Sequence, residues 1–264
     1  MTEAPKKWSD LAARMGSGAG LVVFGLWGVW AGGHVFHAMV ATICGLMVWE
    51  LAVMLRASRD KCLQLGLLTG CAAFAAIYLP SGFALPILLA AALVGFGQLR
   101  QFKAIYMVFS VMVLLAGYGM MSVRDDLGFH WMLWLVLVVV VTDVVGYFAG
   151  RMIGGPKFWP RVSPKKTWSG TVFGWGGAAI VGATFMSTTG SGWQLIGVSI
   201  AVSMASQMGD IAESAIKRRV GVKDSSNLIP GHGGLLDRFD GMLGASVFLL
   251  IIGGPLMGPA IVPG

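Results

Sequence analysis

Charged residues and cysteines are scarce in this 264-residue chain. Asp, Glu, Lys and Arg together make up 12% of the residues, whereas a typical soluble domain contains about 25%. Hydrophobic residues make up 56%, and the mean hydropathy is +0.77. This composition predicts a polytopic membrane protein without a separate large soluble domain. Cys44, Cys62 and Cys71 lie in or beside apolar runs without metal-ligand spacing, so we expect free, buried thiols.

Two further signals are missing from the sequence. The first 15 residues are polar and mixed in charge, and they do not resemble a cleaved signal peptide. The net charge of +7 would suit nucleic acid, but no basic stripe with stacking aromatics and no nucleic-acid motif is present. We therefore expect the bilayer, and no nucleic acid, as a partner.

Long apolar runs, by contrast, are abundant. A transmembrane helix needs about 17–25 apolar residues. By that measure the candidate spans are 17–33, 35–55, 62–79, 83–99, 104–121, 129–150, 170–188, 193–212 and 241–260. The first, fourth and last are glycine-rich or short, so re-entrant or strongly tilted segments remain alternatives for them.

The basic residues predict the orientation of these spans. If the N-terminus is cytoplasmic and the spans alternate, Arg124 is the only one of the 19 Lys and Arg residues that falls outside. Cytoplasmic loops are enriched in Lys and Arg, so this distribution supports both the count and the orientation. The expected fold class is an all-α polytopic membrane protein with about nine transmembrane helices, N-terminus cytoplasmic and C-terminus outside.

A set of polar residues ends the eighth span. Asp210, Glu213, Ser214 and Lys217 have the spacing of one helix face. A carboxylate in a span is costly unless it faces a cation or a water-filled cleft, so we expect Asp210 to point into the protein. A helix-end salt bridge from Asp210 or Glu213 to Lys217 is the structural alternative.

The loop that follows combines glycines with acids. In Pro230-Gly-His-Gly-Gly-Leu-Leu-Asp-Arg-Phe-Asp240, the glycines allow close backbone approach to a ligand. Asp237 and Asp240 lie three residues apart where the last helix should begin, so both can face one site. Carboxylates of this kind suit Mg²⁺ bridging to phosphates. Capping of the helix N-terminus is the alternative.

A second set of polar residues follows the sixth span. Asp143 shares a helix face with Gly146 and Gly150, which permit close helix packing. We expect Asp143 to be buried against a neighbour, in a site rather than in a structural hydrogen bond. Ser163-Pro164 predicts a helix start that, with Lys165 and Lys166, would attract an anion. The two lysines are alternatively plain cytoplasmic anchors.

These two stretches, 142–170 and 214–240, closely resemble the characteristic motifs of the phosphatidate cytidylyltransferases (CDP-diacylglycerol synthases). The resemblance covers roughly residues 140–240. It implies a catalytic membrane region at 140–264, with cytoplasmic loops 151–169 and 213–240, after N-terminal membrane helices of low motif content at 1–139. The chain departs from the family pattern at Ser169, where members often carry an acid.

The resemblance also implies the site residues. Asp210, Asp237 and Asp240 would bind metal and the CTP phosphates, with Lys217 and Arg238 as further catalytic residues. The expected substrate-binding residues are Asp143, Ser163, Lys165, Lys166, Thr167, Arg218, Lys223, Asp224, His232, Gly233 and Gly234. For His232 a phosphate hydrogen bond or loop orientation is favoured over proton transfer, because a phosphate monoester with a second pKa of about 6 is already a nucleophile at neutral pH.

The implied reaction joins CTP to phosphatidate, giving CDP-diacylglycerol and pyrophosphate. Mg²⁺ is the expected cofactor, and the acids leave room for a second cation. The expected location is the prokaryotic plasma membrane, with the active site facing the cytoplasm. A homodimer is suggested by the resemblance alone.

Three other functions share part of this pattern. A CDP-alcohol phosphotransferase would share Asp237-x-x-Asp240-Gly241, but the following Ala-Arg and the later acids are absent. A CTP-dependent polyprenol or phytol kinase would release CDP instead of pyrophosphate. A cation-coupled transporter would explain Asp143 and Asp210 as ion ligands, but not the two polar loops.

Overall fold

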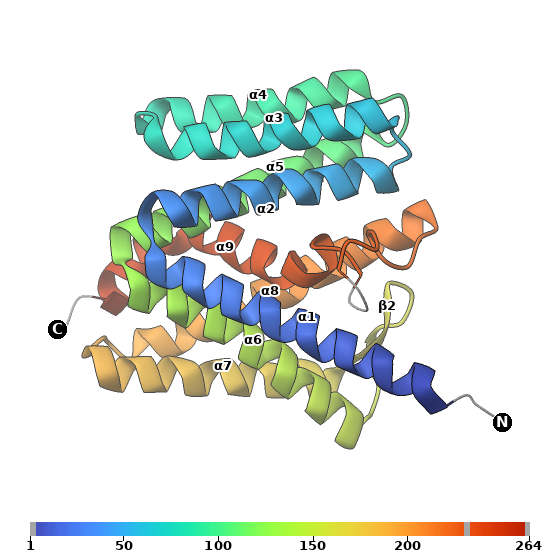
Figure 1. Ribbon diagram of the computed structural model, residues 1–264. Coiled ribbons are helices and arrows are strands. Elements are labelled where there is room, and N and C mark those ends of the chain that lie inside the picture. The colour runs from blue at the N-terminus through green and yellow to red at the C-terminus, as the bar shows by residue number, and fades with distance from the viewer. Residues whose placement is uncertain (1–3, 230–232, 262–264) are drawn as a thin grey trace. The chain divides into compact units, whose positions relative to one another are not determined.

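The computed structural model describes residues 4–229 and 233–261 of the protein. Over these residues the chain forms nine α-helices, a π-helical turn at Val123–Leu127 and two short strands (Figure 1). The helices are α1 (Ala4–Ala31), α2 (Gly33–Met54), α3 (Arg59–Tyr78), α4 (Ser81–Gln98), α5 (Lys103–Ser122), α6 (Phe129–Met152), α7 (Trp168–Thr189), α8 (Gln194–Val220) and α9 (Leu236–Ile261). Each apolar run expected from the sequence has its counterpart in one of these helices.

Several helices are long and apolar enough to cross a bilayer. They are Gly33–Met54, Arg59–Tyr78, Lys103–Leu127, Phe129–Met152 and Gln194–Val220. Shorter apolar stretches occur at Gly18–Ala31 and Gly82–Gln98. The expectation of an all-α membrane protein is therefore confirmed.

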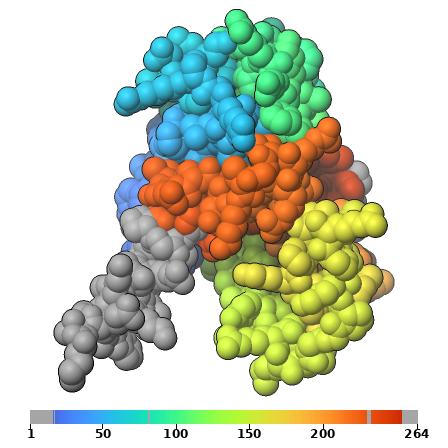
Figure 2. All heavy atoms as spheres, turned by 90° about the vertical axis from the view of Figure 1, so that its right-hand side faces the viewer, coloured from blue at the N-terminus to red at the C-terminus, as the bar shows by residue number. Residues whose placement is uncertain are grey.

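One compact unit combines the chain up to Leu114 with Arg219–Phe239. In this unit α2 packs on α3 and α3 on α4 (Figure 1). The contact between α2 and α3 is close at glycine, since a Cβ on Gly45 would lie 2.7 Å from the carbonyl oxygen of Gly66. The 219–239 segment, orange in Figure 2, adjoins the blue surface of the N-terminal helices. A stretch remote in sequence thus packs with the first helices.

The other unit comprises Leu115–Arg218 and the chain from Asp240 onward. Its helices α6 and α7 lie side by side, and a Cβ on Gly146 would lie 3.0 Å from the carbonyl oxygen of Gly170. The close packing predicted at Gly146 is therefore confirmed. Buried polar side chains also join α6 to α8, with Trp134 Nε1 donating to Ser199 Oγ at 3.0 Å.

A β-hairpin precedes α7 and corrects one prediction. Lys157–Trp159 (β1) and Ser163–Thr167 (β2) pair antiparallel. Ser163-Pro164 therefore does not start a helix, since the fixed φ of proline also suits extended backbone. The helix begins at Trp168, and Thr167 is its N-cap, with Oγ1 accepting from Gly170 N at 3.2 Å. The helix start predicted at Ser163 is therefore wrong, whereas substrate binding by Ser163, Lys165 and Lys166 stays a prediction.

Two burial predictions are also corrected. Cys44 and Cys62 are buried as expected, but the Cys71 thiol is exposed on α3. Asp143 is exposed on α6 rather than buried against a neighbour. On α6 the residues that contact α7 near Gly170 are Gly146 and Gly150.

Candidate functional site

The polar end of α8 remains helical, as expected. Ser214 Oγ donates to Asp210 Oδ1 at 3.3 Å, which places both side chains on one face. On the next turn Lys217 Nζ lies 2.5 Å from Glu213 Oε2. Glu213 is 1% exposed, so this pair lies inside the protein. The predicted alternative of a salt bridge to Lys217 is realised by Glu213, whereas Asp210 pairs elsewhere.

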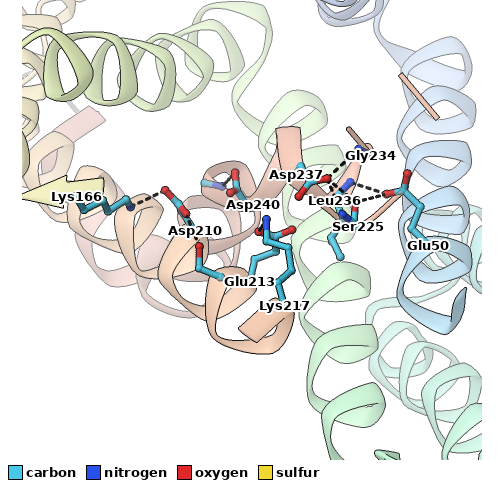
Figure 3. Close-up of polar contacts among 12 residues, drawn as sticks. Glu50, Lys166, Asp210, Glu213, Lys217, Ser225, Gly234, Leu236, Asp237 and Asp240 are labelled. Carbon is cyan, nitrogen blue, oxygen red and sulfur yellow. Dashed lines mark hydrogen bonds and ion pairs between the residues drawn. The ribbon is translucent and has the colours of Figure 1, made fainter. Parts of the chain in front are cut away.

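The partner of Asp210 comes from the β-hairpin. Lys166 Nζ lies 2.6 Å from Asp210 Oδ2 and 3.3 Å from the carbonyl oxygen of Gln207 (Figure 3). Side chains alternate between the two faces of a strand, and the neighbouring Lys165 is exposed while Lys166 is partly buried. The structure therefore joins the Lys-Lys pair to the polar end of α8, just before the 214–240 stretch.

A close approach of α8 and α9 brings Asp240 toward the same residues. A Cβ on Gly209 would lie 2.9 Å from Gly244 N, and a Cβ on Gly244 would lie 3.0 Å from the carbonyl carbon of Ala205. Only a side chain as small as hydrogen allows the two backbones to approach this closely. Because Gly209 immediately precedes Asp210, this contact sets the position of Asp210 relative to α9.

Two further carboxylates, Asp210 and Asp143, lie near Asp240. Asp240 lies in α9 just before the expected span at 241–260. Loss of hydration, followed by the nearby charge of Asp210, raises the pKa of the Asp240 carboxyl to about 7. The charge of Asp143 raises this pKa further, whereas the Gly241 backbone N–H and Lys217 lower it. Two or more carboxylates facing one another in this way form a site that favours cations.

Protein groups alone do not build a complete metal cage here. Among the described residues, no group of three or more His, Cys, Asp or Glu is arranged to hold a metal ion. Mg²⁺ is usually bound by one or two carboxylates together with water and substrate phosphates. Asp210 and Asp240 would fit as the carboxylate ligands of a Mg²⁺ ion that keeps part of its water shell.

Asp237 accepts hydrogen bonds from the loop that precedes α9. Its Oδ2 accepts hydrogen bonds from Ser225 N, Ser225 Oγ and Gly234 N, each at 2.8 Å (Figure 3). The carboxylate thus closes the loop that precedes α9. The loop is also closed by Ile229 N, which donates to the Gly233 carbonyl at 2.8 Å, with Gly233 at a φ of 82°. Asp237 therefore organises the loop, whatever it binds in addition.

The remaining predicted site residues lie mostly on the surface. Ser163 is partly exposed in β2, and Thr167 is buried with its hydroxyl used as the α7 cap. His232 lies outside the described residues. The exposed members of this remaining set are Arg218, Lys223, Asp224 and Arg238.

Sequence reasoning missed Glu50. This side chain of α2 is fully buried, and its two carboxylate oxygens accept four hydrogen bonds from the 219–239 segment. The signal was present, because Glu50 is an acid inside an apolar run, and such residues usually serve a function.

Comparison with known proteins places these motifs in a family. The sequence profile of the cytidylyltransferase family matches residues 12–253. A phosphatidate cytidylyltransferase of Brucella abortus is 42% identical over 146 residues, which are 52% of this chain and 54% of that protein. A phosphatidate cytidylyltransferase of Staphylococcus aureus is 42% identical over 119 residues, which are 44% of this chain and 46% of that protein. The chain spans about half the length of the curated relatives it matches.

The family profile covers nearly the whole chain, including both polar motifs and the helices that position them. On that basis the chain belongs to the cytidylyltransferase family.

Proposed function

We propose that the protein transfers the cytidylyl group of CTP to phosphatidate, giving CDP-diacylglycerol and pyrophosphate for phospholipid synthesis. The observation that carries this proposal is the ion pair between Lys166 and Asp210, which joins the Lys-Lys pair to the polar end of α8. The names of the relatives, both phosphatidate cytidylyltransferases, support the choice of substrates.

Electrostatic repulsion between two phosphate-bearing substrates is the main barrier to this reaction. A phosphatidate oxygen attacks the α-phosphorus of CTP, the bond to the β-phosphate oxygen breaks, and pyrophosphate leaves. Lys166 and Lys217 supply positive charge beside the carboxylates of α8. Their role is to position the phosphates and to stabilise the charge that develops on them.

Mg²⁺ is the proposed cofactor of the protein. Asp210 and Asp240 would hold it, and it would supply Lewis-acid stabilisation of the phosphate charge. Asp237, one turn before Asp240 in α9, remains a predicted third ligand. The exposed Arg218, Lys223 and Arg238 and the glycines of the loop are proposed to contact substrate phosphates, as is Lys165.

The membrane arrangement is proposed from the charges. Nine spans with a cytoplasmic N-terminus and an outer C-terminus leave Arg124 as the only basic residue outside. The site then faces the cytoplasm of a prokaryotic cell, where CTP is available. The lipid would enter from the inner leaflet, whose anionic surface attracts basic loops. A homodimer remains a prediction from the family resemblance.

Labelled CTP tests the proposed reaction against the alternatives. Purified protein in detergent is incubated with phosphatidate, Mg²⁺ and CTP labelled in either the α- or the γ-phosphate. Cytidylyl transfer places the α-label in lipid and the γ-label in pyrophosphate. A lipid kinase would place the γ-label in lipid, and a transporter would place neither there. Either result would contradict the proposal.

A further inference from the structure

Glu50 is the only acidic residue between Met39 and Arg59, and it lies four residues before the end of α2. Its side chain is 0% exposed. Burying a carboxylate is costly unless hydrogen bonds compensate for the lost water. At Glu50 that compensation comes entirely from the 219–239 segment, in the same compact unit.

Four donors surround the two oxygens of Glu50 (Figure 3). Oε1 accepts from Ser226 Oγ at 2.6 Å and from Leu235 N at 2.9 Å. Oε2 accepts from Leu236 N at 2.8 Å and from Ser225 Oγ at 3.3 Å. A carboxylate offers about four lone-pair positions, so these donors match its capacity.

The same network reaches Asp237. Ser225 Oγ lies 2.8 Å from Asp237 Oδ2 and 3.3 Å from Glu50 Oε2, so the two carboxylates share the single proton of this hydroxyl. Gly234 N donates to Asp237, and a Cβ on Gly234 would lie 2.6 Å from Glu50 Oε1. Glycine at 234 is therefore what allows the loop to lie directly on Glu50.

The two backbone N–H groups that donate to Glu50 show which part of the chain this contact stabilises. Leu236 is the first residue of α9, and Leu235 immediately precedes it. The first N–H groups of a helix have no partner within the helix, and Glu50 supplies the acceptors from another helix. A negative charge there is also favoured by the helix dipole. Glu50 thereby fixes where α9 begins, and so where Asp237 lies in its first turn.

We infer that Glu50 is a positioning residue for the proposed cytidylyl transfer: it holds the 219–239 segment and the start of α9, and thus the Asp237 carboxylate, in place. It does not itself touch the substrates. The inference rests on the proposed function for its catalytic consequence, but the structural contact can be measured independently.

The test is hydrogen–deuterium exchange of peptides covering 225–236, measured together with turnover, in Glu50→Gln. The amide keeps the shape of the side chain but turns an NH₂ group toward donors, so the hydrogen bonds cannot all form. We expect faster exchange at Leu235 and Leu236 and a loss of about 10–100-fold in kcat, as for other residues that orient ligands. Glu50→Asp, which keeps the charge, should recover part of both.

Ser110→Ala is the matched control. Ser110 is fully buried in α5 and donates to Met107 within the same helix. Its variant should leave exchange at 225–236 and turnover unchanged. If Glu50→Gln does not fold, Ser226→Ala removes a single donor and should still accelerate exchange.

Unchanged exchange at 225–236 in a folded Glu50→Gln protein would overturn the inference, as would normal turnover despite faster exchange. If the wild type does not transfer label from CTP to lipid, the proposed function fails. The exchange data would then still decide whether Glu50 holds the segment.

Discussion

At the scale of single residues, Lys166 and Asp210 make the contact on which the site depends. Lys166 belongs to a strand and Asp210 to α8, and their charged atoms lie 2.6 Å apart. Both side chains are partly exposed, at 22% and 29%. The pair is therefore accessible to a phosphate, which would compete with Asp210 for the lysine.

The two adjacent lysines provide a matched comparison. We expect Lys166→Ala to lower kcat/KM for CTP by about 100-fold, because a charge placed close to the reacting phosphate is lost. Lys165→Ala should cost clearly less, because Lys165 is exposed on the other face of β2. Steady-state kinetics with both variants measures the difference. Equal losses of kcat/KM in the two variants would contradict the prediction that the two lysines, on opposite faces of β2, have different roles.

The sequence predicts which residues belong to the candidate site better than it predicts which residues they contact. The spacing of Asp210 and Lys217 indicated one helix face, and α8 has it. The spacing could not show that Glu213 would take Lys217 while Asp210 would pair with Lys166, since that choice depends on tertiary contacts. Glu50 was missed because its donors lie about 180 residues further along the chain.

At the scale of secondary-structure elements, glycine sets the separation of the helices that carry the acids. The contact between Gly209 on α8 and Gly244 on α9 leaves no space for a methyl group on either. Helix pairs of this kind rely on small residues in membranes. The position of Asp210 beside Asp240 is thus a consequence of backbone packing.

Gly209→Ala tests this packing. The added methyl should push α8 and α9 apart, at a cost of about 1–3 kcal/mol in the free energy of unfolding, and should also lower kcat. Gly197→Ala in the same helix has no neighbouring atom within 4 Å of the added methyl and should reduce neither. Thermal unfolding in detergent and the labelling assay report the two effects. A Gly209→Ala protein with the stability and kcat of the wild type would refute the close contact between α8 and α9.

The elements themselves were largely predictable, with one instructive error. Apolar runs located all the helices of the described chain, because length and hydropathy suffice for that purpose. The prediction of a helix start at Ser163-Pro164 is wrong, because a Ser-Pro pair fits extended backbone equally well. Thr167, four residues later, provides the actual cap.

At the scale of the whole molecule, the distribution of positive charge predicts its orientation in the membrane. Single cysteines introduced at Lys157 or Lys223, in a chain whose native cysteines are replaced, should react with an impermeant maleimide only when the cytoplasmic face is exposed. A cysteine at Asp126 should react from outside. Labelling in intact cells and in inverted vesicles distinguishes the two sides. Labelling of the Lys223 and Asp126 positions from the same side would contradict an alternating nine-span arrangement.

The sequence predicts least well which distant segments of the chain pack together. Composition alone indicated a membrane protein, and the two polar motifs marked the site. The sequence offered no indication that Arg219–Phe239 packs with the first helices. In that packing one buried acid, Glu50, accepts hydrogen bonds from two backbone N–H groups and two serine hydroxyls, and donors of these kinds occur throughout the sequence.

The most direct test of the central claim compares wild type, Asp240→Asn and Asp126→Asn in the assay with α-labelled CTP, phosphatidate and Mg²⁺. The amide oxygen of the Asp240→Asn variant can still accept the hydrogen bond that Gly241 N makes to Oδ1 at 2.8 Å, so the helix start should persist. Loss of the charge should lower transfer of label to lipid by at least about 100-fold, the effect of several kcal/mol. Asp126 is exposed in the π-helical turn, and its variant should match the wild type. Label transfer by Asp240→Asn at the wild-type rate would contradict the account.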